Sequence, residues 1–279
     1  MNSVFVAASI MGGLGLALAT VLSIAYRFLR VEEDPRIDGV EERLPGSNCG
    51  ACGEPGCRAF AERLVADDAV PAQCTVSSPE AIDAVAAYLG VDAGEAQRRV
   101  ARLHCAGGSG QAIRAAEYAG FGSCRAATLV SGGGKGCSWG CLGLADCELA
   151  CSFGAIEMTV EALPRVDPTT CTACGDCVEA CPKNLFELLP LEAGLLVQCA
   201  APLAGDEAVA VCTVACDACG RCALDAPAGL VEMVQQLAWV DYGSGVTGGE
   251  EATSRCPTGA IQFLSGGQFE GLARRRDAV

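Results

Sequence analysis

The chain has 279 residues, including 20 cysteines and a single histidine, His104. Its 34 acidic and 19 basic residues give a formal net charge of −15 at pH 7, which argues against a nucleic-acid-binding protein. One histidine excludes Rieske centres and His-rich zinc sites, and no C-x-x-C-H sequence is present for haem attachment. We expect His104 to be a packed or surface side chain rather than a metal ligand. The many cysteines indicate either a disulfide scaffold or metal clusters.

The N-terminal stretch predicts a membrane anchor over residues 1–30. Residues 1–26 carry no charge, and residues 4–22 are almost wholly apolar or small. At about 1.5 Å per residue, such a helix can span about 30 Å of hydrocarbon. A cleaved signal peptide is the alternative: residues 17–19 resemble a cleavage site, but no positive charge precedes the apolar run.

The basic residues Arg27 and Arg30 follow this apolar stretch. The positive-inside rule therefore predicts a single-pass protein of the cell (inner) membrane with its bulk on the cytoplasmic side. Residues 31–44 are charged and contain Pro35 and Gly39, so they are expected to form a linker.

A four-cysteine domain is predicted over residues 45–76. Its cysteines follow C-x2-C-x4-C-x16-C spacing, and intervening glycines permit tight turns. A short helix over residues 58–65 is expected before the last cysteine. Three thiolates on one loop and one beyond the helix predict a [4Fe–4S] site, with structural zinc as the alternative. The proposed ligands are Cys49, Cys52, Cys57 and Cys74.

Residues 77–130 are expected to form a helical connector without chemistry of its own. A capping box at Ser77–Glu80 predicts one helix that ends at Gly90. Asp92 begins a second predicted helix that runs toward Leu103. Cys105 and Cys124 have no ligand-like neighbours in the sequence, so they are interpreted as buried free thiols, with a shared site as the alternative.

A two-cluster ferredoxin domain is predicted over residues 131–190. Its second cysteine group has C-x2-C-x2-C-x3-C-P spacing, the run that binds [4Fe–4S] clusters in bacterial ferredoxins. A zinc knuckle usually has two C-x2-C pairs and no C-P ending. The first group has longer gaps, C-x3-C-x5-C-x3-C, and Ser152 replaces the expected proline.

In such ferredoxins the fourth cysteine of each group binds the other cluster. One predicted set is therefore Cys137, Cys141, Cys147 and Cys181, and the other is Cys151, Cys171, Cys174 and Cys177. The residues between the groups, 153–167, are expected to form a short hairpin.

The glycine-rich stretch Ser131–Gly136 fails the test for a phosphate-binding loop, because Leu129 stands where the first glycine is needed and Lys135 is not followed by Ser or Thr. No G-x-G-x-x-G follows a strand. We therefore expect no nicotinamide or flavin site on this chain and no bond-making catalytic site.

Residues 214–264 repeat the ferredoxin pattern in degenerate form, after a connector over 191–213 and before a tail over 265–279. One complete ligand set survives: Cys216, Cys219, Cys222 and Cys256. The set for the other cluster is replaced by small or apolar residues: Ala226, Val246, Gly249 and Ala252. This pattern predicts a fourth [4Fe–4S] cluster beside a filled site, with an empty module as the alternative. Cys199 and Cys212 are left unassigned.

The predicted fold class is α+β: an N-terminal transmembrane helix, a small four-Cys [4Fe–4S] domain, a two-cluster ferredoxin-like domain and a degenerate second ferredoxin-like module. In this order, the motifs at Leu44–Cys57, Lys135–Cys147 and Cys171–Pro182 resemble the family of the B component of Rnf electron transport complexes, which are ion-translocating ferredoxin:NAD oxidoreductases. Ser152 and the four missing ligands depart from the family pattern and affect the expected cluster count more than the role.

The resemblance implies a subunit of an enzyme complex, a translocase. It would accept electrons from soluble ferredoxin on the cytoplasmic side and pass them to other Rnf-type subunits that carry flavins and NAD. That flow would drive Na+ or H+ across the membrane. The residues themselves support only cluster ligands on a membrane tether. The alternatives are an iron–sulfur subunit of another membrane-associated reductase or hydrogenase complex, and a zinc-bound structural adaptor.

Overall fold

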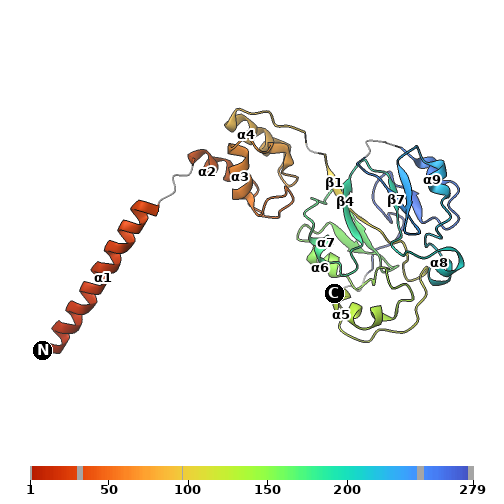
Figure 1. Ribbon diagram of the computed structural model, residues 1–279, viewed down its shortest axis with the longest axis horizontal. Coiled ribbons are helices and arrows are strands. Elements are labelled where there is room, and N and C mark those ends of the chain that lie inside the picture. Colours follow the sequence, from red (N-terminus) through yellow and green to blue (C-terminus); the bar gives the residue numbers. More distant parts are fainter. Residues whose placement is uncertain (1, 30–33, 96, 244–247, 276–279) are drawn as a thin grey trace.

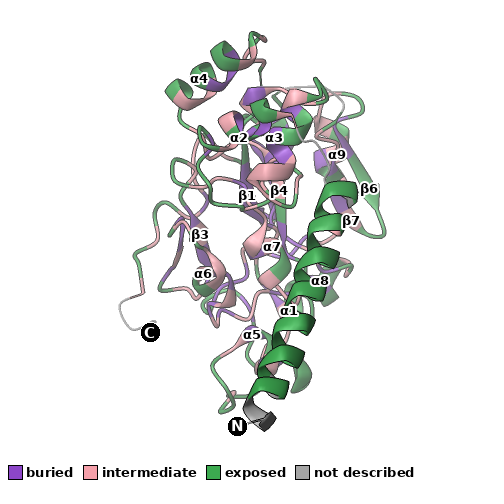
Figure 2. Cartoon of the chain, turned by 90° about the vertical axis from the view of Figure 1, so that its left-hand side faces the viewer, coloured by how far each residue is buried: buried purple, intermediate pink, exposed green. Residues whose placement is uncertain are grey.

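The computed structural model describes residues 2–29, 34–95, 97–243 and 248–275. Three parts follow one another along the chain (Figure 1): a long helix, a small helical domain and a larger body. The first part is α1, Asn2–Leu29. Nearly all of its described side chains are exposed (Figure 2), and Ala8–Phe28 is long and apolar enough to cross a membrane. The predicted apolar helix near the N-terminus is thus confirmed.

The small domain contains α2 (Pro35–Glu41), α3 (Cys57–Val65), the 3-10 turn η1 (Pro71–Gln73) and α4 (Pro79–Leu89). Its core gathers apolar side chains from α2, α3 and α4, among them Val40, Phe60, Leu64 and Val85. The linker predicted over residues 31–44 is wrong over α2. Its charged residues lie on the outer face of an amphipathic helix, whereas Ile37 and Val40 are buried.

The other helices of this domain follow the sequence signals closely. The helix predicted over 58–65 begins one residue earlier, at Cys57. The capping box predicted at Ser77–Glu80 is shifted by one residue: the hydroxyl of Ser78, not of Ser77, accepts a hydrogen bond from the backbone N–H of Ala81 at 3.3 Å and caps α4. The helix ends at Gly90, whose φ of +70° favours glycine.

The body consists of two similar units, each built as strand, helix, hairpin, short helix and strand. The first unit contains β1 (Arg99–Leu103), α6 (Asp146–Ala150), β2 (Ile156–Met158), β3 (Pro164–Val166), α7 (Asp176–Ala180) and β4 (Phe186–Pro190). The second contains β5 (Leu195–Val197), α9 (Arg221–Asp225), β6 (Val231–Val234), β7 (Leu237–Val240), η3 (Glu250–Thr253) and β8 (Ile261–Phe263). Insertions before the first helix of each unit carry α5 (Cys124–Leu129), η2 (Ser131–Gly134) and α8 (Gly205–Val211).

The same antiparallel pairing occurs in both units. The first and last strands pair, β1 with β4 and β5 with β8. The middle strands form hairpins, β2 with β3 and β6 with β7. The hairpin expected between the two cysteine groups of the ferredoxin domain is therefore confirmed.

The helix predicted from Asp92 toward Leu103 is wrong, because residues 99–103 form β1. Val100, Ala101 and Leu103 are all buried, so this stretch packs as a strand against β4 rather than as a connector helix. This strand lies before residue 131, where the ferredoxin domain is predicted to begin. The first strand of each unit falls inside a predicted connector, since nothing local identifies a three- to five-residue strand whose partner is more than 60 residues away.

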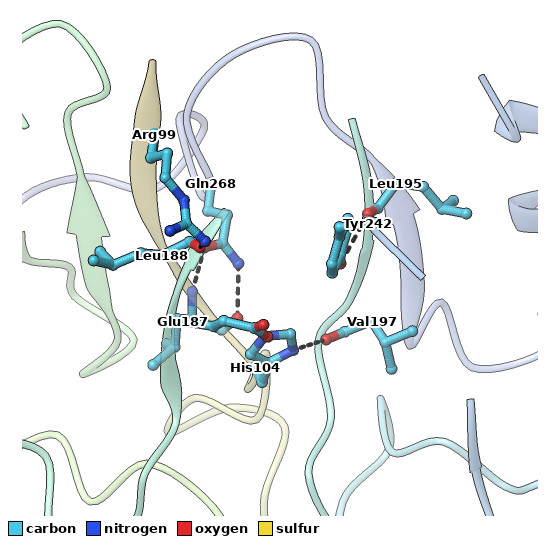
Figure 3. A network of polar contacts seen from close by, with 9 residues as sticks. Arg99, His104, Glu187, Leu188, Leu195, Val197, Tyr242 and Gln268 are labelled. Carbon is cyan, nitrogen blue, oxygen red and sulfur yellow. Dashed lines mark hydrogen bonds and ion pairs between the residues drawn. The ribbon is translucent and has the colours of Figure 1, made fainter. Parts of the chain in front are cut away.

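A polar network joins the two units (Figure 3). The two ring nitrogens of His104 lie 2.8 Å from the Val197 carbonyl oxygen and 3.0 Å from Glu187 Oε2. The buried Gln268 side chain bonds both backbone groups of Leu103, at 2.7 and 2.9 Å. His104 therefore connects β1 and β4 to β5, and Gln268 closes the end of β1.

Candidate metal centres

All twenty cysteines lie in the described part of the chain, and all are free thiols. Within that part, no group of three or more His, Cys, Asp or Glu side chains is arranged to hold a single metal ion. Zinc draws four thiolates close together through bonds of about 2.3 Å, whereas a [4Fe–4S] cubane binds each thiolate to a different iron. Sets of four thiols around one position therefore suit a cubane.

The first centre belongs to the small domain, where the predicted ligands are Cys49, Cys52, Cys57 and Cys74. Asn48 shapes the loop, because its Oδ1 accepts a hydrogen bond from the backbone N–H of Cys57 at 2.8 Å. Gly56 has to be small, since an added Cβ would lie 2.9 Å from the same oxygen. Burial raises the pKa of Cys52, and the nearby Cys74 and Cys49 thiols add to the effect. Cys52 therefore lies near both Cys74 and Cys49.

The second centre is the predicted set Cys151, Cys171, Cys174 and Cys177, and the structure brings all four together. They line one cavity of about 20 Å³ beneath β1 and β4. Burial, together with the other three thiols, raises the pKa of Cys177 to about 12. The backbone N–H of Ala155 points at Cys151 Sγ from 3.3 Å, the kind of contact that tunes a bound cluster.

The third centre differs from the predicted set. Cys141, Cys147 and Cys181 lie together, but their fourth neighbour is Cys124 instead of Cys137. Burial raises the pKa of Cys147, and the thiols that reinforce this rise include those of Cys141, Cys124 and Cys181. Cys137 lines a separate cavity.

Asp146 explains how Cys124 reaches this centre. Its carboxylate accepts hydrogen bonds from the backbone N–H groups of Cys124 and Arg125, at 2.9 and 3.0 Å, and from the Ser123 hydroxyl at 3.2 Å. Three contacts at the first turn of α5 fix Cys124 beside Cys147, which follows Asp146 on α6.

The fourth centre is the set that survives in the second unit. Burial raises the pKa of Cys222 to about 11, and Cys216, Cys256 and Cys219 all contribute to that rise. Burial alone would raise the pKa of Cys256 too, but hydrogen bonds to its sulfur from the backbone around Ile261 and Thr258 bring it below its usual value. The four thiols therefore lie near one another, with Cys219 exposed.

The other site of the second unit is filled by apolar side chains. An added Cβ at Gly249 would lie 2.6 Å from Leu230 Cδ2 and 3.2 Å from Leu195 Cδ2. Ala252 is buried in the same core. Of the positions that lack a ligand, Val246 lies outside the described residues.

The first and second centres lie side by side. The Thr75 hydroxyl, next to Cys74, donates a hydrogen bond of 2.6 Å to the backbone carbonyl of Thr172. Thr172 lies between Cys171 and Cys174. The small domain therefore contacts the first unit through the residues that flank their cysteines.

Four cysteines left without a role by the sequence lie close to these centres. Cys124 joins the third centre, and Cys105, Cys199 and Cys212 line one cavity with Cys137. The unusual gaps around Cys137 and Cys141 were the available signal, because they show that the first cysteine group departs from ferredoxin geometry. Spacing alone could not name Cys124, which comes from a different segment.

Comparison with known proteins finds iron–sulfur families in this chain. The family model described as "Putative Fe-S cluster" matches residues 44–76, and the "4Fe-4S binding domain" model matches residues 163–186. The B component of the Na(+)-translocating ferredoxin:NAD(+) oxidoreductase complex of Acetobacterium woodii is 40% identical, over 94% of this chain and 78% of the relative.

Two further relatives match over almost their whole length. The B component of the ion-translocating oxidoreductase complex of Methanosarcina acetivorans is 34% identical over 94% of this chain and 100% of the relative. The B component of the proton-translocating ferredoxin:NAD(+) oxidoreductase complex of Clostridium ljungdahlii is 37% identical over 96% and 95%. The chain therefore belongs to the B-component family of ion-translocating oxidoreductase complexes, the Rnf family that its motifs resemble.

Proposed function

We propose that this chain is the membrane-anchored iron–sulfur electron-transfer subunit of an Rnf-type complex, an ion-translocating oxidoreductase. The observation that carries the proposal is the combination of complete four-thiol sets with a single apolar helix, in a chain that matches its relatives over nearly its whole length. When bound, a [4Fe–4S] cluster supplies a one-electron carrier whose potential depends on burial, charge and hydrogen bonds to sulfur. The protein holds each set at a fixed place, and at least one thiol of each set is buried.

The ligand sets follow from which thiols face one another. The first two are the predicted ones, Cys49, Cys52, Cys57 and Cys74 in the small domain, and Cys151, Cys171, Cys174 and Cys177 in the first unit. For the third we replace the predicted Cys137 by Cys124, which gives Cys124, Cys141, Cys147 and Cys181. The fourth is the surviving set of the second unit: Cys216, Cys219, Cys222 and Cys256.

The domain arrangement that we propose follows the pairing of strands. Residues 1–30 anchor the chain, 34–90 form the small domain, 99–190 form the two-cluster unit and 195–264 form the degenerate unit. Thr75 and Thr172 support an electron path from the small domain into the first unit, because their hydrogen bond joins the segments that carry Cys74 and Cys171.

The proposed direction and partners come from the family. The relatives are named for ferredoxin and NAD(+), so we propose soluble ferredoxin as the donor and the other complex subunits as the route toward NAD. One relative is named for Na(+) and another for protons, so the moved ion is either of these. Arg27, at the end of α1, supports a cytoplasmic location for the body.

Metal analysis of the full chain tests this proposal. The protein is purified anaerobically in detergent, and iron, zinc and acid-labile sulfide are measured per chain. We expect at least about sixteen irons, four for each set, and absorption at about 400 nm that reduced ferredoxin bleaches. Zinc with little iron would contradict the electron-transfer role. Co-purifying hydrogenase or other reductase subunits would favour the alternative complex instead.

A further inference from the structure

Four cysteines outside the sets above surround one cavity between the two units. The cavity measures about 20 Å³, the same as the cavity of the second centre, and its lining is likewise mainly apolar. Its thiols come from four separate segments: just after β1, the loop before α6, just after β5, and the end of α8. They are Cys105, Cys137, Cys199 and Cys212.

Contacts within this cavity bring the sulfurs close to one another. An added Cβ at Gly107 would lie 2.9 Å from Cys212 Sγ and 3.8 Å from Cys105 Sγ, so both sulfurs lie against one glycine. Burial raises the pKa of Cys212, and Cys105 and Cys137 add to it as like charges. Burial likewise raises the pKa of Cys199 to about 11, with a contribution from Cys105. Each of the four thiols therefore interacts with at least one other thiol of the cavity.

The charge around the cavity suits a set of thiolates. The Lys135 ammonium group donates to the backbone carbonyls of Gly107 and Cys141 at the edge of the cavity. It lies near Cys212, whose thiolate it would favour. A buried set of four negative sulfurs is costly without such a partner or a metal cluster.

The cysteine count leaves no thiol unexplained. The four sets proposed above use sixteen of the twenty cysteines, and the remaining four are those of this cavity. All of them are free and buried. If these four remaining cysteines were scattered over the surface or over different parts of the core, they would be unrelated thiols.

We infer that Cys105, Cys137, Cys199 and Cys212 bind a fifth [4Fe–4S] cluster, between the first and second units. Binding displaces one proton from each of the four thiols, and the four thiolates each bind one iron of the cluster. The role of this site as a relay rests on the proposed function, but its occupancy by iron is a separate question.

The position of the fifth site fits a relay between the third and fourth centres. Toward the third centre, the backbone N–H of Cys141 lies 3.4 Å from Cys105 Sγ. Toward the fourth, Cys216 lies close enough to Cys199 to contribute to the raised pKa of its thiol. Each neighbour is thus one ligand residue away, and a single electron could pass from one unit to the other through this site.

Iron counting on the full-length protein, purified anaerobically in detergent, tests the inference. The wild type is expected to hold about twenty irons and about twenty sulfides per chain, against about sixteen without a fifth site. Cys212→Ser and Cys105→Ser should each lose about four irons, and the double variant should lose the same four, because both thiols serve one cluster. Val209→Ala, an exposed position on α8 outside the cavity, is the control and should keep all twenty.

The outcomes separate this inference from the proposed function. About sixteen irons in the wild type, unchanged in Cys212→Ser, would overturn the fifth site and leave the proposed function standing. Little iron in the wild type would overturn both. If a variant loses nearly all its iron, it has misfolded, and the wild-type count then decides the question alone.

Cys137 gives the sharpest discrimination between ligand sets. If it belongs to the fifth site, combining Cys137→Ser with Cys212→Ser loses about four irons, whereas combining it with Cys124→Ser loses about eight. If it binds with Cys141 and Cys147, the first pair loses about eight, which would contradict the inference. Electron paramagnetic resonance of the reduced proteins counts the same clusters as spins and does not depend on activity.

Discussion

The two units of the body share a backbone but differ in what fills it. Both bend the cluster loop through an alanine with positive φ, Ala173 at +57° and Ala218 at +60°. The first unit encloses two thiol sets. The second keeps one, and Leu195 and Leu230 occupy the space of the other, against Gly249. The fold therefore persists after a set is lost when apolar side chains replace the volume that the cluster would occupy.

The largest expected difference between the units concerns removal of a thiol. Cys177→Ser and Cys222→Ser should each lose about four irons, since each breaks one set. The melting temperature should fall further for Cys177→Ser, because metal binding is part of the folding free energy and thiols form a larger share of the first unit's core. The second unit has an apolar core beside its set. Equal shifts, measured calorimetrically under anaerobic conditions with Ser152→Ala as the control, would break the comparison.

The filled site of the second unit can be tested with a matched pair of glycines. Gly248 and Gly249 both have positive φ, at +93° and +89°, so alanine is strained at either position. Only Gly249 also lacks space, because Leu230 lies 2.6 Å from the added Cβ. We expect Gly249→Ala to lower the free energy of unfolding by about 1–3 kcal/mol more than Gly248→Ala. Denaturant titration measures both, and equal losses would mean that the site is open.

Asp146 marks a difference between the helices α6 and α9. Its carboxylate holds the start of α5, whereas Arg221 occupies the equivalent position before Cys222. Asp146→Ala should lower the free energy of unfolding by about 2 kcal/mol, since it removes the acceptor for three donors. Arg221→Ala should change it by less than about 0.5 kcal/mol. Iron release from the third centre should also be faster in Asp146→Ala alone; an unchanged rate would argue against Cys124 as a ligand.

The smallest expected effect concerns one backbone carbonyl in each unit, which directly follows Cys171 in the first unit and Cys216 in the second. Thr172 accepts from the Thr75 hydroxyl, and Asp217 accepts from the backbone N–H of Gly205 at 2.8 Å. Thr75→Val removes the hydrogen bond to Thr172, which lowers the local stability of that loop by about 1 kcal/mol. Amide hydrogen exchange around Cys174 should therefore accelerate about fivefold. The Ser77 hydroxyl is buried without a partner, so Ser77→Ala is the control and should leave exchange unchanged.

Local patterns predicted the parts of the site that are local. Cysteine spacing is enough to propose the C-x2-C-x2-C loops and the set that includes Cys222, because short loops fix the geometry. It also suggests that the fourth cysteine of each group lies with the three cysteines of the other group. Cys124 could not be predicted from spacing, because α5 reaches the third centre only through Asp146, 22 residues further on. The same holds for the fifth set, whose four thiols come from separate segments.

The same holds for the fold: elements determined by nearby residues were predicted, and elements that depend on residues far along the chain were not. The α4 cap and the hairpins follow from nearby residues. The strand β1 was mistaken for a helix, because its identity depends on β4, which pairs Leu103 with Phe186. α2 was mistaken for a linker, because its charges conceal the two apolar residues that face α3.

Gln268 has a consequence for the timing of synthesis. Both backbone groups of Leu103 bond this one side chain, 165 residues further along the chain. While the chain emerges from the ribosome, β4 is complete well before Gln268 is available. At about 5–20 residues per second, the end of β1 then stays uncapped for several seconds. We expect this interval to be the period in which the thiols of the first unit are most accessible for cluster insertion.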